Sequence, residues 1–243
     1  MKKLKYGEND CTNLEYHSDR VWLNSSALKY LMHGWENYEK NYLKREPKKP
    51  NSNFEVGSLM HSLLLEPHNT KRDFAIYNGP TRQGKRFKEF KSQHPNKIII
   101  TRKTFQKINT IVKSYKRRKS FRKIFTKGLK EHTVCAWVKG IRVKARFDCI
   151  DVENGRIFDL KSSRYSRSEY GYFISDSLKF NYNLSAAFYI AVAESFYKRK
   201  FEFTLVALDK RYGDHFYHSY RFAQEELKLG RENMFKALKN YKK

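Results

Sequence analysis

The N-terminal half of the chain shows the three- and four-residue spacing of apolar side chains that is typical of amphipathic helices. Its first predicted helix has an apolar stripe that consists of Leu28, Leu31, Trp35, Tyr38 and Tyr42. Ser25 or Ser26 is the expected N-cap of this helix, because a serine hydroxyl can accept a hydrogen bond from a free backbone amide. A second helix is predicted over residues 56–65, where Pro67 would end it, and a third begins near Thr104.

The second half changes to the alternating pattern of β-strands and later returns to helical spacing. The predicted strands are residues 132–138, 141–151, 156–160, 201–208 and 215–221. Gly140 and the Asn154-Gly155 pair stand where hairpin turns are expected. Helices are predicted over residues 182–197 and 223–241, and two polar segments, residues 46–53 and 78–84, are predicted loops.

This order of elements predicts a mixed α/β protein with helices in front of a sheet. The length of 243 residues favours one domain over two. We therefore expect a single domain over residues 1–243, with a mainly helical part at 1–130 and a sheet-containing core at 131–243.

Two aspartates and one lysine are predicted to meet on neighbouring strands. Along residues 141–148, apolar side chains alternate with charged ones, and Asp148 ends the charged row. In the next strand Asp159 and Lys161 share one face. If these strands pair through the Asn154-Gly155 turn, the carboxylates converge with the amine beside them.

Such a group suits metal-assisted hydrolysis of a phosphodiester. Asp148 and Asp159 could hold a hard divalent cation, and Lys161 could orient or deprotonate water or stabilise charge on the phosphate. The alternative is that the two aspartates are solvated or paired with nearby arginines, since this spacing is common by chance. On local sequence alone, His61 and Tyr182 are core side chains and Glu131 is an exposed charge.

The charge of the chain points to a polyanionic partner. Lysine and arginine number 51 against 25 for aspartate and glutamate, which gives a formal net charge of +26. Nucleic acid is the leading candidate and an anionic membrane surface the second. The basic segment 113–119 could touch DNA or could be a solvated helix face.

The same sequence argues against several other classes of protein. A 40% share of hydrophobic residues argues against wholesale disorder. There is no apolar run long enough to span a bilayer and no secretory signal pattern. Binding to a membrane surface has no support in the sequence beyond charge, so we expect no membrane partner. The three scattered cysteines disfavour a disulfide framework or a thiolate metal site and favour a reducing cytoplasm.

The ordered set of motifs resembles the RecE (exodeoxyribonuclease VIII) family of phage-type exonucleases within the RecB-like PD-(D/E)XK nucleases. The resembling segments are LNSSALKYLM from Leu23, FEVGSLMHSLLLEP from Phe54, TRQGKRFKEF from Thr81, GIRVKARFDCID, GRIFDLKSS, and NYNLSAAFY from Asn181. Together they extend from about Leu23 to Tyr197. The resemblance implies a restriction-endonuclease-like core, in which a mixed central sheet is flanked by helices, with an N-terminal helical region.

The resemblance also implies roles for individual residues. His61, Asp148, Asp159 and the carbonyl of Leu160 would hold the metal, Mg²⁺ with Mn²⁺ as a substitute. Lys161 would be catalytic, and Glu131 would stand close to the metals. The implied or candidate DNA contacts are Tyr182, Ser185, Arg82, Lys85, Arg86 and Ser162. Ser185 replaces the family's glutamine, and a serine reaches less far and has fewer hydrogen-bonding groups.

Two functions are therefore expected from the sequence. The first is a Mg²⁺-dependent exonuclease that hydrolyses linear double-stranded DNA from its ends. The resemblance favours the 5′-to-3′ direction. Similar enzymes produce single strands for a partner annealing protein in recombination, and ring-shaped homo-oligomers occur among them, although the sequence carries no signal for such an interface. The alternative is a non-catalytic basic protein that binds nucleic acid on a degenerate nuclease fold.

Overall fold

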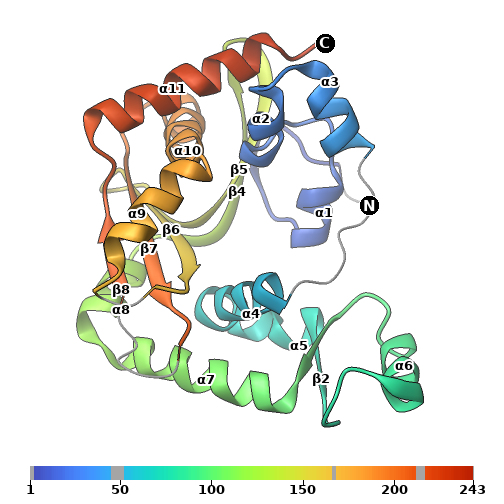
Figure 1. The fold of residues 1–243 in the computed structure, drawn as a ribbon. Helices are drawn as coiled ribbons and strands as arrows, with labels where there is room; N and C mark the ends of the chain where they lie inside the picture. The colour runs from blue at the N-terminus through green and yellow to red at the C-terminus, as the bar shows by residue number, and fades with distance from the viewer. Residues whose placement is uncertain (1–2, 45–51, 166–167, 212–216, 243) are drawn as a thin grey trace.

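The computed structural model describes residues 3–44, 52–165, 168–211 and 217–242 (Figure 1). The predicted loop at 46–53 lies outside the described residues except for Ser52 and Asn53, which begin a helix. The prediction of a mixed central sheet flanked by helices is confirmed.

The centre of the molecule is a six-stranded sheet with strand order β1-β4-β5-β6-β7-β8. Only β6 and β7 pair in parallel, and the other neighbours are antiparallel. The strands are β1 Gly7–Asn9, β4 Leu129–Val138, β5 Ile141–Asp151, β6 Arg156–Ser163, β7 Glu202–Asp209 and β8 Tyr217–Tyr220. Because β1 pairs with β4, the extreme N-terminal part of the chain also joins the core sheet.

A two-residue turn fixes the register of β4 against β5. Lys139 and Gly140 have φ values of 51° and 73°, and two positive φ angles are the mark of a type I′ hairpin. Val138 pairs with Ile141 across this turn. Glycine adopts such a conformation without steric cost, which explains its place in the sequence.

Helices cover both faces of the sheet (Figure 1). On one face, α2 Ser25–Leu31, α10 Tyr182–Tyr197 and α11 Gln224–Lys239 share a buried core with Val143, Ala145 and Phe203. On the other face, α4 Ser52–Leu65, α7 Arg102–Arg117 and α8 Lys119–Thr126 pack over Leu160 and Val206.

The remaining elements are short or lie at the periphery. They are α1 Asn13–Ser18, α3 Trp35–Tyr38, the π-helix η1 Glu39–Leu43, the 3₁₀-helix η2 Pro67–Asn69, α5 Thr70–Asp73, α6 Gly84–Ser92 and α9 Tyr170–Lys179. A parallel pair, β2 Phe74–Tyr77 and β3 Ile98–Thr101, forms a separate small sheet. No helix in the described segments has the length and apolarity needed to cross a membrane.

The prediction of one continuous helix from residue 25 to residue 42 is wrong. Helix α2 ends at Leu31, and Gly34 has a φ of 105°, which a right-handed helix cannot accommodate. The chain forms helix again as α3 and η1, so Trp35, Tyr38 and Tyr42 belong to a second helical segment that is separate from α2. The predicted cap is also wrong, because Asn24 accepts the hydrogen bond from Ala27 N at 2.9 Å.

Part of the charged row of β5 is covered by the N-terminal segment, while Arg142 stays exposed. Lys144 is fully buried, and its ammonium donates hydrogen bonds to the carbonyls of Tyr16 and Asp19. Burial lowers the pKa of Lys144, which the Asp19 carboxylate partly opposes. A buried cation is tolerated when it is paired and hydrogen-bonded in this way.

Candidate metal and nuclease site

Three carboxylates from neighbouring strands stand at one level of the sheet. The pairs Lys130↔Cys149 and His132↔Phe147 place Glu131 opposite Asp148. Cys149 pairs with Phe158, and the next pair along these antiparallel strands sets Asp159 opposite Asp148. Glu131, Asp148 and Asp159 are therefore consecutive members of one row across β4, β5 and β6.

The strands are irregular at this row. Phe147 packs in the core on one face of the sheet and Cys149 in the core on the other, although residues two apart in a regular strand share a face. Glu131 has a φ of 49°, a left-handed conformation that is costly for a residue with a side chain. Asp148 uses its carboxylate to accept a hydrogen bond from Leu160 N at 2.6 Å.

Helix α4 brings His61 to the same place. Its buried residues Leu59, Met60 and Leu63 pack against the sheet and fix the helix. His61 Nδ1 lies 3.7 Å from Asp148 Oδ2 and 4.0 Å from Glu131 Oε1, and its Nε2 lies 3.0 Å from Leu160 O. One ligand atom from each of His61, Glu131 and Asp148 can be chosen so that all lie within 4.8 Å of one another.

The electrostatics of the metal-free group favour a proton on the histidine. Burial opposes it, but the charges of Asp148 and Glu131 outweigh burial and raise the pKa of His61 to about 9. Burial also raises the pKa of Asp148 to about 7, against the opposing effect of His61. Burial would raise the pKa of Glu131, yet His61 and Arg146 hold it below its ordinary value. A divalent cation would take the place of this proton.

Asp159 and Lys161 form an ion pair next to this cluster. The Lys161 ammonium donates to Asp159 Oδ2 and, at 3.2 Å, to Leu160 O. Burial opposes protonation, but Asp159 and Asp148 raise the pKa of Lys161 above its ordinary value. The amine is therefore charged at neutral pH.

Arg146 is a site residue that the sequence reasoning missed. Its side chain is only 9% exposed, and its Nε donates to Glu131 Oε2 at 2.7 Å. Its Nη2 lies 3.3 Å from Glu66 Oε2, and its Nη1 donates to Cys11 O at 2.8 Å. One guanidinium thus connects β4, the end of α4 and the N-terminal segment. A usable signal was present, because Arg146 precedes Asp148 by two residues on the same strand.

Lys29 is a second residue that was not predicted. Its ammonium donates to Phe180 O at 2.8 Å and lies 4.9 Å from the centre of the Tyr182 ring, and Lys161 Nζ lies 5.6 Å from the same centre. Burial, assisted by the charge of Lys161, lowers the pKa of Lys29 to about 8. Two cations therefore flank Tyr182 at the edge of the site.

The other predicted DNA contacts have partners of their own or face solvent. Arg82 forms a two-point ion pair with Glu55, at 2.6 and 2.9 Å, and Lys85 and Arg86 are exposed on α6. Ser162 stands against Gly57 of α4, and the Ser185 hydroxyl is 3.5 Å from Asn181 O. Figure 1 shows α6 at the edge of the molecule, beyond α4 and β2 as seen from β6.

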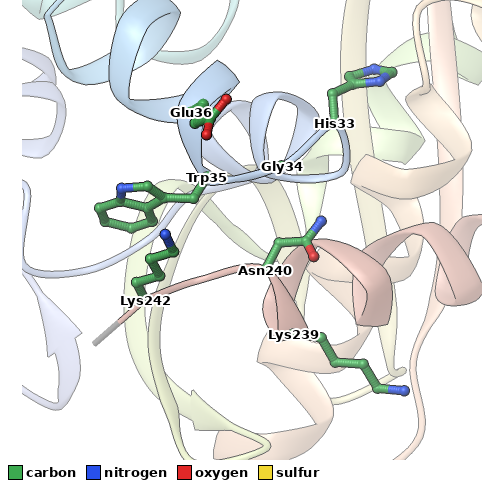
Figure 2. Close-up of a pocket in the computed structure, with 7 residues that line it drawn as sticks. All are labelled: His33, Gly34, Trp35, Glu36, Lys239, Asn240 and Lys242. Carbon is green, nitrogen blue, oxygen red and sulfur yellow. The ribbon is translucent and has the colours of Figure 1, made fainter.

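A pocket of about 420 Å³ lies elsewhere, between the α2–α3 turn and the end of α11 (Figure 2). Its lining residues are His33, Gly34, Trp35, Glu36, Lys239, Asn240 and Lys242. It contains none of the predicted site residues.

Comparison with known proteins agrees with the fold. A crystal structure of a suspected exonuclease from Eubacterium rectale superposes with a TM-score of 0.65 at 14% identity, covering 96% of this chain and 86% of that one. The crystal structure of SSO0001 has a TM-score of only 0.31 at 11% identity, covering 86% of this chain and 84% of that one. No curated protein matches the chain.

A family model described as a PDDEXK-like domain of unknown function (DUF3799) matches residues 24–243. The matched region contains every residue of the row of carboxylates, together with His61 and Lys161. The chain belongs to this PDDEXK-like family.

Proposed function

We propose that the protein is a metal-dependent nuclease that hydrolyses phosphodiester bonds in DNA. The observation that carries this proposal is the convergence of His61, Glu131 and Asp148 within 4.8 Å, next to the Asp159–Lys161 ion pair. Carboxylate oxygens and one imidazole suit a divalent cation such as Mg²⁺ or Mn²⁺.

The side chains present fit such an ion. Asp148, Glu131 and His61 Nδ1 would hold it, with Asp159 as a further ligand. The carbonyl of Leu160 lies at the other ring nitrogen, 3.0 Å from His61 Nε2, and would ligate only an ion bound on that side of the ring. The ion would polarise the scissile phosphate and lower the pKa of a bound water. His61 Nε2 faces Leu160 O, and a hydrogen bond on the far side of the ring fixes the orientation of a ligating histidine.

The charged state of Lys161 narrows its role. A protonated ammonium cannot accept a proton from water, so Lys161 would donate hydrogen bonds to the phosphate and stabilise negative charge as it develops. Asp159 holds the amine in place in the metal-free protein. Lys29 and the Tyr182 ring would contact the sugar–phosphate backbone of the DNA, on the side of the site where Lys29 and Lys161 flank the ring.

We further propose that the substrate is linear double-stranded DNA, degraded from its ends in the 5′-to-3′ direction with Mg²⁺. The resemblance to RecE-type exonucleases and the suspected exonuclease activity of the Eubacterium rectale protein support this choice. An annealing protein as partner, a homo-oligomer and a role in recombination remain predictions from the resemblance alone.

The decisive experiment compares linear duplex and covalently closed circular DNA in Mg²⁺ and in EDTA. We expect the linear DNA to be degraded only with Mg²⁺, and Asp148→Asn to abolish degradation. Asp151→Asn is the matched control, because Asp151 is on the same strand but accepts hydrogen bonds from Asn154 in a turn. Duplexes labelled at the 5′ or 3′ end would give the direction.

Two results would contradict the proposal. Equal degradation by wild type and Asp148→Asn would show that the activity comes from elsewhere. Tight DNA binding without cleavage under any divalent metal would favour the alternative, a basic binding protein on a degenerate nuclease fold.

A further inference from the structure

Helices α7 and α8 carry positive side chains that the proposed chemistry does not use. Residues 91–130 contain 14 lysines and arginines and no aspartate or glutamate. One face of these helices is buried through Ile108, Ile111, Val112, Tyr115, Phe121 and Phe125. At helical spacing, the opposite face carries six exposed cations, here called the basic ridge: Lys103, Lys107, Lys113, Arg117, Lys119 and Lys123.

The charge of the basic ridge is not neutralised within the protein. None of its six side chains forms an ion pair with another residue that the structure describes. Helix α11 differs, because its cations alternate with Glu225, Glu226 and Glu232. A row of like charges repels itself, so the ridge costs stability unless a polyanion binds it.

The shape and composition of the ridge fit a nucleic-acid duplex. Helix α7 has 16 residues and is about 24 Å long, and duplex DNA presents one negative charge per about 1.7 Å of its axis. Single-strand binding uses exposed aromatic side chains as stacking platforms, and membrane binding uses exposed apolar ones. None of the exposed large hydrophobic side chains in the described segments lies on α7 or α8.

The ridge and the metal site lie on different sides of α4. Helix α7 packs on α4 in one shared core, while His61 faces the sheet strands. Figure 1 shows α7 along the edge of the molecule opposite α11. The chain leaves α8 through Gly128 and enters β4, which carries Glu131.

We propose that the basic ridge binds the phosphate backbone of duplex DNA without metal and without reading its sequence. It thereby holds the duplex on a surface separate from the cutting site. The inference rests on the proposed function only in naming DNA as the polyanion.

The test measures binding of a short fluorescent duplex in EDTA over a range of salt concentrations. The ridge variant combines Lys107→Gln, Lys113→Gln and Arg117→Gln. The matched control combines Lys228→Gln, Arg231→Gln and Lys236→Gln, three exposed cations of α11. We expect the ridge variant to bind about tenfold more weakly or worse, and its salt dependence, the slope of log K against log salt, to fall by about 2.7 for three lost contacts. The control should bind like wild type.

Unchanged duplex binding by the folded ridge variant would overturn the inference, as would an equal loss in the control. Binding to vesicles of phosphatidylserine and phosphatidylcholine that fails in the ridge variant, with duplex binding intact, would assign the ridge to lipid instead. If wild type fails to cut DNA in Mg²⁺ but the ridge variant still loses binding in EDTA, DNA binding by the ridge is supported and the proposed hydrolysis is contradicted.

Discussion

At the scale of single residues, the orientation of Glu131 depends on Arg146. One oxygen of the Glu131 carboxylate accepts a hydrogen bond from Arg146, which leaves the other facing His61. The same guanidinium also forms an ion pair with Glu66 and donates a hydrogen bond to the carbonyl of Cys11. Outer partners of this kind fix the orientation of metal ligands, and their loss weakens metal binding.

Arg146→Lys should therefore weaken Mn²⁺ binding by about 10- to 100-fold, because a lysine cannot reach Glu131, Glu66 and Cys11 O at once. Titration calorimetry on the metal-free protein measures this. Arg142→Lys is the control, because Arg142 lies on the same strand but its side chain stacks on Trp137. A folded Arg146→Lys protein with wild-type Mn²⁺ affinity would show that Arg146 does not position Glu131.

The shared proton predicts how stability varies with pH. The folded protein holds the His61 proton up to a pKa of about 9, while an unfolded histidine loses it near 6.5. Between these values the native state binds more protons, so the free energy of unfolding falls as the pH rises, by about 1–3 kcal/mol. Denaturant unfolding in EDTA should show this loss in wild type and not in a variant that combines His61→Gln with Asp148→Asn. The second change is needed because the pKa of Asp148 would rise further without the charge of His61.

With Mn²⁺ present, the free energy of unfolding should instead rise with pH, because the metal binds the deprotonated imidazole. If the metal-free protein kept the same free energy of unfolding from pH 6.5 to 9, or if the double variant lost as much as wild type, the assignment of this proton to His61 and Asp148 would be wrong.

At the scale of elements, the spacing of side chains predicted five strands of the central sheet and the helices α4, α7, α10 and α11, because burial of one face is visible in a sequence. It did not predict β1, β2, β3, α1, α5, α6, α8 or α9, which are mostly short. Helix α10 begins and ends where it was predicted. The break at Gly34 was not foreseen, because the apolar residues continue on both sides of it at helical spacing. A backbone conformation with positive φ leaves no trace in the hydrophobic pattern.

Gly34 and Gly171 offer a matched pair of substitutions. No atom lies within 4 Å of a side chain added at either position, but only Gly34 has a positive φ. Gly34→Ala should lower the free energy of unfolding by about 1–2 kcal/mol through backbone strain alone. Gly171→Ala, inside α9, should raise it by about 0.5–1 kcal/mol.

Urea unfolding of both variants provides the measurement. If the two alanines had equal effects, the left-handed conformation at Gly34 would not be what separates α2 from α3.

At the scale of the whole molecule, part of the site could be read from the sequence and part could not. The turn at Asn154-Gly155 was enough to predict that Asp148 and Asp159 converge, but the register that sets them opposite each other comes from the pairing of Asp151 with Arg156 in the structure. The two-residue turn at Lys139-Gly140 fixes Glu131 opposite Asp148. His61 came from the family resemblance alone, because nothing local distinguishes it from a core histidine.

Long-range contacts account for what the sequence did not show. Arg146, Lys144 and Lys29 look like surface cations in a very basic chain, yet each is held by segments far away along the sequence. A sequence does not distinguish a buried lysine or arginine from a solvated one, and in a chain with so many cations these three did not stand out.

The most direct test of the central claim is a crystal structure of the protein soaked in Mn²⁺, with the ion located by its anomalous scattering. We predict an ion about 2.0–2.6 Å from Asp148, Glu131 and His61 Nδ1. No ion between these side chains at saturating Mn²⁺, with His61 Nδ1 still facing the two carboxylates as it does without metal, would contradict the account.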